Sequence, residues 1–159
     1  MLTLKIAGLN LLILGLNLEK AIKIDNKHRI IIPAFTGVEP NEELVLQLNM
    51  LENILFIYGK DEFYKKSKLF EQTLKEQSRR LGMSLSDLRK IQRLYYSKLS
   101  FMPEKVDREK RIIIPEKVIS SLELTDRVFV IGKNHHIELC KNRDIYEQII
   151  SEEQKRRGK

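Results

Sequence analysis

Apolar residues along the chain follow two different spacings, which predict both strands and helices. Short runs rich in Ile, Val and Leu predict strands at 20–25, 29–33, 44–48 and 54–58, and again at 105–107, 111–115, 127–131 and 136–140. Apolar residues at helical spacing predict a helix from 84 to about 99, and further helices are expected at 61–81 and after residue 142. The predicted order of elements is therefore ββββ–α–α–ββββ–α.

Polar residues mark the predicted ends of these helices. Asp61 and Asn142 are candidate N-caps, because a side-chain oxygen at that position accepts a hydrogen bond from a free backbone N–H. Ser84 followed by Asp87 resembles a weak capping box, and Gly82 is expected to end the helix before it.

The elements occur twice because the chain contains an internal repeat. Residues 23–33 are KIDNKHRIIIP and residues 105–115 are KVDREKRIIIP, at an offset of 82 residues without a gap. Each copy has an Asp and an Arg four residues apart, followed by three isoleucines and a proline. Units of about 45 residues rarely bury enough apolar surface alone. The two copies are therefore expected to share one core or to pair with other chains.

The repeated segments predict their own local structure. Residues 20–25 and 29–33 are expected to form a hairpin, or a closely related turn, around residues 26–28, because Asp and Asn favour turns. The isoleucines at 30–32 and 112–114 are all expected to lie in the core.

Five segments follow from these patterns. They are an apolar N-terminal extension (1–18), a first repeat (19–63), a helical connector (64–101), a second repeat (102–145) and a C-terminal helix with a basic tail (146–159). Within the connector, residues 80–93 are similar in outline to a helix-turn-helix. The rest of a three-helix core is missing, so a helical hairpin is the preferred interpretation.

The N-terminal extension leaves several alternatives open. Its uncharged stretch, 6–18, has 13 residues, fewer than the roughly 20 needed to span a bilayer, so no membrane partner is expected. A basic start followed by an apolar run is typical of a signal peptide, but no small-x-small cleavage site precedes Glu19. The remaining interpretations are a strand or helix packed on the core or on a neighbouring subunit, or residues added by an upstream start codon.

Charge points to an anionic partner. The net charge is +7 and the pI about 9.5, which favours nucleic acid as the simplest partner. Residues 65–98 contain ten Lys or Arg against three acidic residues, a local excess of +7. The plainer interpretation is a solvated helical face, and the sharper one is a basic surface that follows phosphates.

Other chemistry has little support in the sequence. The single cysteine, Cys140, excludes an internal disulfide and a Cys-based zinc site, and its expected role is that of a partly buried apolar side chain at a strand end. No His or carboxylate stands at metal-ligand spacing, and there is no phosphate-binding glycine loop or nucleophile elbow. We therefore expect no enzyme activity, no metal, no cofactor and no small-molecule substrate.

The two repeated turns are the candidate site. Arginine can donate two hydrogen bonds to guanine and can pair with phosphate, and a β-ribbon is thin enough to enter the major groove. The alternative is that each Asp–Arg pair only clamps its own turn. The candidate DNA-binding residues are Lys23, Lys27, His28, Arg29, Lys105, Arg108, Lys110 and Arg111, and the candidate turn-structuring residues are Asp25, Pro33, Asp107 and Pro115.

These repeats resemble the MraZ family, bacterial transcription factors with two AbrB-like (SpoVT-AbrB, swapped-hairpin) halves. The resemblance runs from about residue 18 to residue 146. It rests on two Asp-x-x-x-Arg-x-x-x-Pro motifs, on RKIQRLYYSKLSF at 89–101 and on VFVIGKNHHIELC at 128–140. The chain departs from the family at four positions, where the family usually has Gly, Gly, Gly and Trp: Leu18, His28, Lys110 and Cys140.

The resemblance implies a fold and a function. The fold would be α+β, with two pseudo-symmetric swapped-hairpin β units forming one double-psi-like β core and peripheral helices after each repeat. The protein would be a cytoplasmic, nucleoid-associated, ring-like homo-oligomer. It would bind short direct repeats in double-stranded DNA upstream of the division and cell-wall gene cluster, usually as a repressor. Arg29 is the best candidate for DNA contact, and Arg111 is its counterpart.

Two other classes of function remain as alternatives. One is an AbrB-type antitoxin or an oligomeric interaction scaffold whose basic helices bind an acidic protein. The other is an RNA-binding or RNA-modifying enzyme, for which the sequence offers no catalytic residues.

Overall fold

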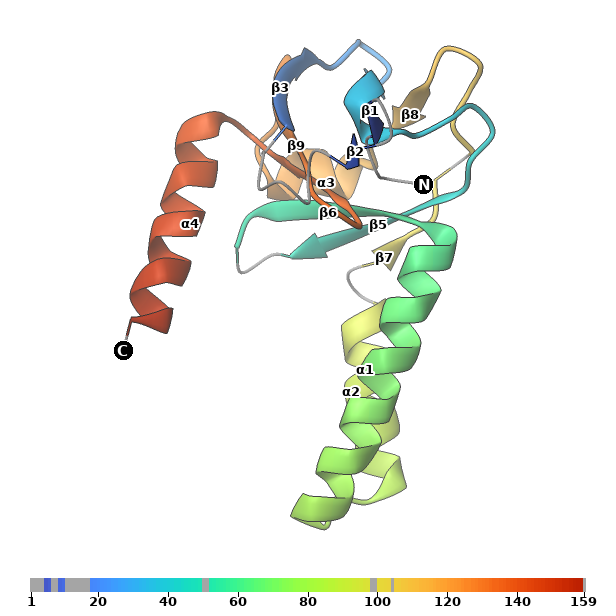
Figure 1. Ribbon diagram of the computed structural model, residues 1–159, viewed down its shortest axis with the longest axis vertical. Coiled ribbons are helices and arrows are strands. Elements are labelled where there is room, and N and C mark those ends of the chain that lie inside the picture. The colour runs from blue at the N-terminus through green and yellow to red at the C-terminus, as the bar shows by residue number, and fades with distance from the viewer. Residues whose placement is uncertain are drawn as a thin grey trace.

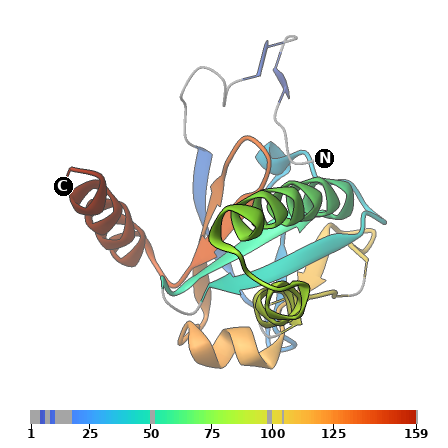
Figure 2. The same ribbon diagram turned by 90° about the horizontal axis from the view of Figure 1, so that it is seen from below.

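The structure, a computed structural model, describes residues 5–6, 9–10, 18–49, 52–97, 100–103 and 105–158. Over these residues the chain has an α+β fold, with a six-stranded antiparallel sheet, two two-stranded sheets and four α-helices. Figure 1 shows the six-stranded sheet in one body, from which α1 and α2 project together. Figure 2 shows that α4 leaves this body at a separate place.

The elements have the following bounds. The strands are β1 (Lys5–Ile6), β2 (Leu9–Asn10), β3 (Leu18–Lys23), β4 (Arg29–Ile31), β5 (Leu44–Asn49), β6 (Ile54–Gly59), β7 (Ser100–Phe101), β8 (Arg111–Ile113), β9 (Arg127–Gly132) and β10 (Ile137–Cys140). The helices are the 3₁₀ turn η1 (Ala34–Thr36), α1 (Lys60–Leu81), α2 (Leu85–Ser97), α3 (Glu116–Ser121) and α4 (Arg143–Arg157).

Strands from the two repeats alternate in the main sheet. Its order is β3-β9-β10-β6-β5-β7. β3 pairs with β9, and β7, which is the counterpart of β3 although it lies at the end of the predicted connector (64–101), pairs with β5. The fourth strands, β10 and β6, pair with each other. When every strand is replaced by its counterpart 82 residues away, the order is only reversed. The two repeats are therefore related by a pseudo-two-fold axis.

The two-stranded sheet formed by β4 and β8 has the same symmetry. Ile30 pairs with Ile112, its own counterpart, so the axis passes through this pair. It also passes through the pair of Phe56 with Glu138. Both members of the first pair are 2% exposed and belong to the same apolar cluster as residues of β5, β6, β9 and β10. The predicted shared core is therefore present within one chain.

Three predictions about the repeats need correction. Residues 20–25 and 29–33 do not form a hairpin, because β3 joins the main sheet and β4 pairs with β8. The alternative expectation, a related turn around residues 26–28, is confirmed: the N–H of His28 donates to the carbonyl of Asp25 at 3.1 Å. Residues 105–107 are not a strand. The ladder of β7 ends at Phe101, before Pro103, which has no N–H to donate. The isoleucine triplets are not wholly buried, since Ile31 is 60% and Ile113 44% exposed.

The helix ends follow the predicted caps with one exception. The Asn142 side chain accepts from the N–H of Ile145 at 2.9 Å, and the Ser84 hydroxyl accepts from the N–H of Asp87 at 3.2 Å. Gly82 ends α1 with φ 68°. The prediction for Asp61 is wrong, because α1 begins at Lys60 with Gly59 as its N-cap. Asp61 instead lies in the first turn of α1, where its negative charge interacts favourably with the helix dipole.

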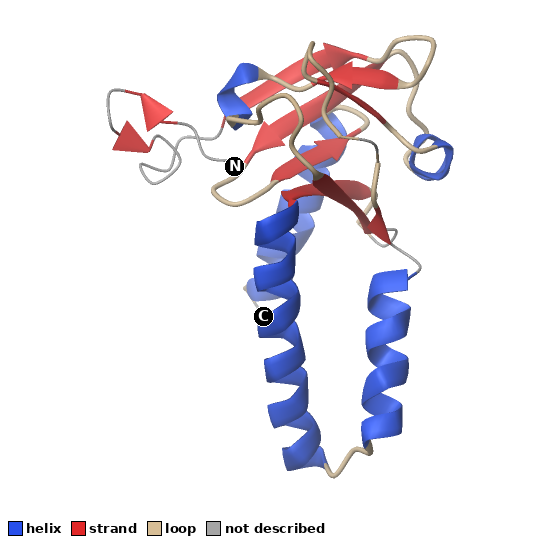
Figure 3. Cartoon of the chain, turned by 90° about the vertical axis from the view of Figure 1, so that its right-hand side faces the viewer, coloured by secondary structure: helices blue, strands red, loops and turns tan. Residues whose placement is uncertain are grey.

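The helical hairpin predicted for residues 80–93 is present as α1 and α2, which run side by side away from the sheet (Figure 3). The short helix α3 and the turn η1 were not predicted. Most of the alternatives for residues 1–18 fall outside the described residues. The described parts there are β1, which pairs with β2, and Leu18 at the start of β3. No helix of the described ranges is both long and apolar enough to cross a bilayer.

His28 and Lys110 generate a stability prediction, because both hold a left-handed backbone with φ 59°. That conformation costs a residue with a Cβ about 1–2 kcal/mol, and glycine's greater freedom in the unfolded chain offsets part of the gain. His28→Gly and Lys110→Gly should each raise the free energy of unfolding, measured in urea, by about 0.5–1 kcal/mol. His28→Ala and Lys110→Ala are the controls. Glycine variants no more stable than the alanine variants would contradict the prediction.

Candidate nucleic-acid interface

The first repeated turn is closed by one carboxylate. Oδ1 of Asp25 accepts from the backbone N–H groups of Lys27 and Arg29 at 2.9 and 2.8 Å. Oδ2 accepts from Nε of Arg29 at 2.7 Å. Between the ends of the turn, the N–H of Asp25 donates to the carbonyl of Arg29 at 3.0 Å. The side chain that shapes the turn therefore also orients the guanidinium group.

The second turn repeats this geometry closely. Oδ1 of Asp107 accepts from the N–H groups of Glu109 and Arg111 at 2.9 and 2.8 Å, and Oδ2 accepts from Nε of Arg111 at 2.8 Å. Pro33 and Pro115 occupy equivalent places after the strands. Each lies at the N-terminus of a helical turn, η1 or α3, with φ near −60° (−59° and −58°).

Both clamps are ionised at neutral pH. The backbone N–H of Arg29, and then its guanidinium, lower the pKa of Asp25 from 3.8 to about 2 against the opposing effect of burial. The pKa of Asp107 is lowered for the same reasons by Arg111, and the hydrogen bond from Arg111 to Asp107 raises the pKa of Arg111. Each carboxylate thus balances part of the charge of its arginine locally.

The two arginines lie on one face of one ribbon. Arg29 stands opposite Ile113, and Arg111 stands opposite Ile31, in the register of β4 with β8. Because successive side chains on a strand alternate between faces, these four residues share the outer face, and the buried isoleucines share the inner one. We call this outer face, Arg29, Ile31, Arg111 and Ile113, the ribbon face. It combines residues that are 82 positions apart in the sequence.

The two halves of the ribbon face are not equivalent. Nη1 of Arg111 lies 3.2 Å from Oε2 of Glu109, so a second carboxylate holds its guanidinium. The position equivalent to Glu109 in the first repeat is Lys27. Within the described ranges, the two terminal nitrogens of Arg29 have no bonding partner. Arg29 is therefore the freer donor of the two.

The other predicted residues divide into two groups. Lys27, His28, Arg108 and Lys110 lie in the two turns, and thus at the ends of the ribbon. Lys23 and Lys105 precede the turns. Lys23 lies on β3 opposite Arg127, and Lys105 Nζ lies 4.0 Å from Glu43, a carboxylate that also accepts from Lys60 at 2.7 Å.

In the helical connector, Lys66 differs from its basic neighbours. Its ammonium lies 2.5 Å from the hydroxyl of Tyr58 and 4.5 Å from that ring's centroid, so it faces β6. Much of its side chain is exposed, but desolvation at the ammonium lowers its pKa. From the sequence alone, Lys66 was only one of the ten Lys and Arg residues of segment 65–98, and nothing set it apart from the others. The apolar run of β6 and its single tyrosine were the signal that a lysine of α1 packs there.

A second polar cluster, around His136, was also missed. Nε2 of His136 lies 3.5 Å from Oε1 of Glu138, and the hydroxyl of Tyr146 donates to Oε2 of Glu138 at 3.3 Å. The hydrogen bond between Tyr146 and Glu138 links α4 to β10. Cys140 ends the same strand, fully buried, and burial raises the pKa of its thiol to about 11. In the described part of the chain no three His, Cys, Asp or Glu side chains are grouped to hold a metal ion.

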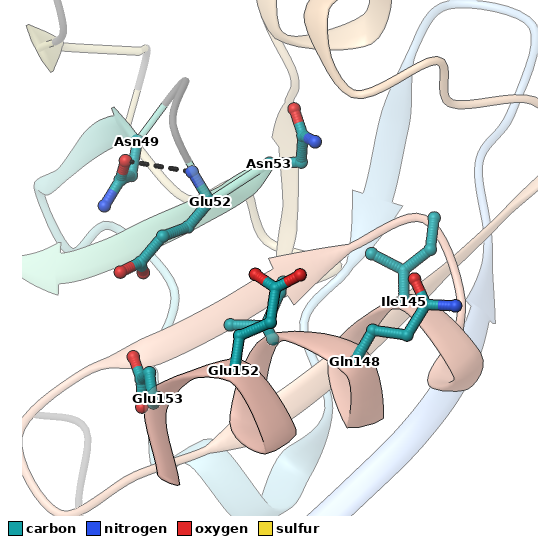
Figure 4. A pocket seen from close by; sticks show the side chains of 8 residues that line it. Asn49, Glu52, Asn53, Ile145, Gln148, Glu152 and Glu153 are labelled. Atoms are coloured by element: carbon teal, nitrogen blue, oxygen red, sulfur yellow. Dashed lines mark hydrogen bonds between the residues drawn. The ribbon is translucent and has the colours of Figure 1, made fainter. Parts of the chain in front are cut away.

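A cavity of about 420 Å³ lies between the β5–β6 connection and α4 (Figure 4). Its lining residues are Asn49, Glu52, Asn53, Ile145, Gln148, Ile149, Glu152 and Glu153. Three of them carry carboxylates, which would repel phosphate, and none belongs to the ribbon face. The cavity therefore does not extend the candidate interface.

Compared with the known protein families, the chain matches no family model.

The clamps predict a definite pH dependence. A carboxyl whose pKa is lowered by folding stabilises the folded state above its unfolded value of 3.8, and that contribution disappears as the pH falls toward about 2. The wild type should therefore be more stable than the double variant Asp25→Asn, Asp107→Asn by a constant margin above about pH 5, and the margin should shrink steadily as the pH falls through 3.8 toward about 2. Urea unfolding at a series of pH values measures it. A margin unchanged down to pH 2 would contradict the role of the clamps.

Proposed function

We propose that the protein is a sequence-specific, DNA-binding transcriptional regulator of the MraZ type. The observation that carries the proposal is the ribbon face. It presents one arginine from each repeat, both fixed by a carboxylate, on the outer side of a two-stranded ribbon. A ribbon of this kind fits the major groove of B-DNA.

The clamp accounts for how such a ribbon would recognise a base. Asp25 engages Nε of Arg29 and leaves the edge formed by the two terminal nitrogens. That edge matches the N7 and O6 acceptors of guanine. Because the guanidinium is already held, it loses less side-chain entropy on binding. The turn residues Lys27 and Arg108, both exposed, then supply contacts to phosphate.

The proposal extends to the fold and the assembly. The exchange of strands between the repeats supports two swapped-hairpin units that form one double-psi-like core. A ring-like homo-oligomer would present several ribbon faces to short direct repeats, and each weak contact would then be multiplied by effective concentration. The expected target is the promoter of the division and cell-wall gene cluster, where the protein would repress from a cytoplasmic, nucleoid-associated location.

A second candidate function has one observation in its favour. The α1–α2 hairpin exposes Leu69, Leu81 and Leu85 by 65, 74 and 68% of their surface, apolar side chains that a protein partner would cover. An AbrB-type antitoxin or interaction scaffold would use this hairpin to bind another protein. Co-purification of a stoichiometric protein partner would favour the scaffold, whereas DNA affinity that falls steeply with salt and depends on sequence would favour the regulator.

The arginines generate the main test. The preferred duplex is selected from a random-sequence pool by the full-length protein, and affinity is measured by fluorescence anisotropy at fixed salt. Arg29→Ala and Arg29→Lys should each weaken binding by about 5- to 150-fold, because a bidentate guanine contact is worth about 1–3 kcal/mol and lysine cannot form it. The matched control is Arg80→Ala, an exposed arginine of α1. Arg111→Ala is measured in parallel, and unchanged affinity in both folded arginine-to-alanine variants would contradict the proposal.

The asymmetry between the turns generates a separate test. Glu109→Gln removes a carboxylate that holds Arg111 and repels phosphate, so it should tighten DNA binding by about two- to fivefold, the equivalent of about 0.5–1 kcal/mol. Lys27→Glu, which gives the first turn the carboxylate of the second, should weaken it. Glu123→Gln, remote in sequence and paired with Lys141, is the control. Glu109→Gln binding that is no tighter than the control would show that this carboxylate does not limit Arg111.

A further inference from the structure

Two large apolar side chains stand beside the arginines on the ribbon face. Ile31 is 60% and Ile113 44% exposed, although both lie within isoleucine triplets whose other members are at most 3% exposed. They are counterparts in the two repeats. The core is already filled from the inner face by Ile30, Ile32, Ile112 and Ile114, so packing within the chain does not require apolar residues on the outer face.

The register places these isoleucines close to the arginines and to each other. The N–H of Ile32 donates to the carbonyl of Lys110, and the N–H of Ile114 donates to that of His28, each at 2.8 Å. The outer-face pairs, Arg29 with Ile113 and Ile31 with Arg111, therefore lie between these bonds, where opposed side chains approach most closely. Ile31 and Ile113 are diagonal neighbours, roughly 7–8 Å apart or less.

The outer face thus has a defined chemical pattern. One diagonal carries two guanidinium groups and the other carries two branched apolar side chains. A surface that met only phosphates would gain nothing from the apolar diagonal. In the major groove, the acceptors of guanine match the first diagonal, and the C5-methyl group of thymine is the apolar feature that matches the second. RNA lacks this methyl group on uracil, and its deep major groove excludes side chains.

We propose that Ile31 and Ile113 contact thymine C5-methyl groups in the major groove and so determine part of the sequence preference, next to the bases bound by Arg29 and Arg111. This inference rests on the proposed DNA-binding function and names the base feature recognised at the same surface. It makes the ribbon face a four-residue recognition unit in which the arginines select guanine and the isoleucines select thymine.

The test removes the methyl group from the DNA and the side chain from the protein. In the selected duplex, each thymine is replaced in turn by deoxyuridine, and the full-length protein is titrated by anisotropy. Substitution at one or more positions should weaken wild-type binding by about fourfold for each methyl group, or about 0.8 kcal/mol. Ile31→Ala or Ile113→Ala should lose this discrimination at the corresponding thymine. Ile31→Val, which keeps a branched side chain, should retain it.

Controls separate a local contact from a general effect. Leu85→Ala alters an even more exposed apolar residue (68%) at the start of α2, and it should leave the thymine-to-deoxyuridine ratio unchanged. Circular dichroism and light scattering show whether each variant keeps its fold and oligomeric state. Ile31→Ala and Ile113→Ala remove exposed rather than buried groups, so both are expected to fold.

The possible outcomes distinguish a failure of this inference from a failure of the proposed DNA-binding function on which it rests. Arginine-dependent, sequence-specific binding with no loss on deoxyuridine substitution would overturn the inference and leave the proposed function standing. The same holds if Ile31→Ala and Ile113→Ala keep full discrimination. If these variants instead change the oligomeric state, the isoleucines form a contact between copies and the inference is wrong. Absence of any sequence preference in the wild type would overturn the proposed function and the inference together.

Discussion

The pairing of Ile30 with Ile112 across β4 and β8 is the constraint on which the rest of the structure depends. It lies on the pseudo-two-fold axis, fixes the register of the ribbon, and buries the inner isoleucines in the core shared by both repeats. Side chains on a strand alternate between faces, so a slip of one residue would bury the two arginines and expose the core. The inner face of this short ribbon therefore belongs to the core, and its outer face forms the candidate interface.

The carboxylate clamps convert this ribbon into a chemically specific surface. Asp25 and Asp107 each close a turn whose left-handed residue is not glycine, and each fixes an arginine by its Nε. The departure from glycine at His28 and Lys110 leaves the turn geometry in place and adds basic side chains at both ends of the ribbon. Glu109 breaks the symmetry because it holds Arg111 and has no counterpart beside Arg29. The two nearly identical turns are therefore expected to contribute unequally to DNA binding.

The sequence revealed what is local and missed what depends on distant pairing. The caps at Asn142 and Ser84, the glycine that ends α1, and the pairing of β5 with β6 follow from short-range rules. The exchange of β3 and β7 between repeats does not, because either repeat could have closed its own hairpin with the same residues; only the family resemblance implied swapped hairpins. The triplets of isoleucine gave no alternation from which to predict that Ile31 faces outward, and only the register with β8 decides it.

The most direct test of the account is site-specific photo-cross-linking. Benzoylphenylalanine is placed at position 31, at position 113, or at position 69 on α1, and each full-length protein is irradiated with its selected, labelled duplex. Cross-links to DNA are expected from both 31 and 113 and none from 69, if one ribbon face built by both repeats meets the groove. Cross-links from position 69, with none from either ribbon position, would contradict it and would place the nucleic acid on the helical hairpin.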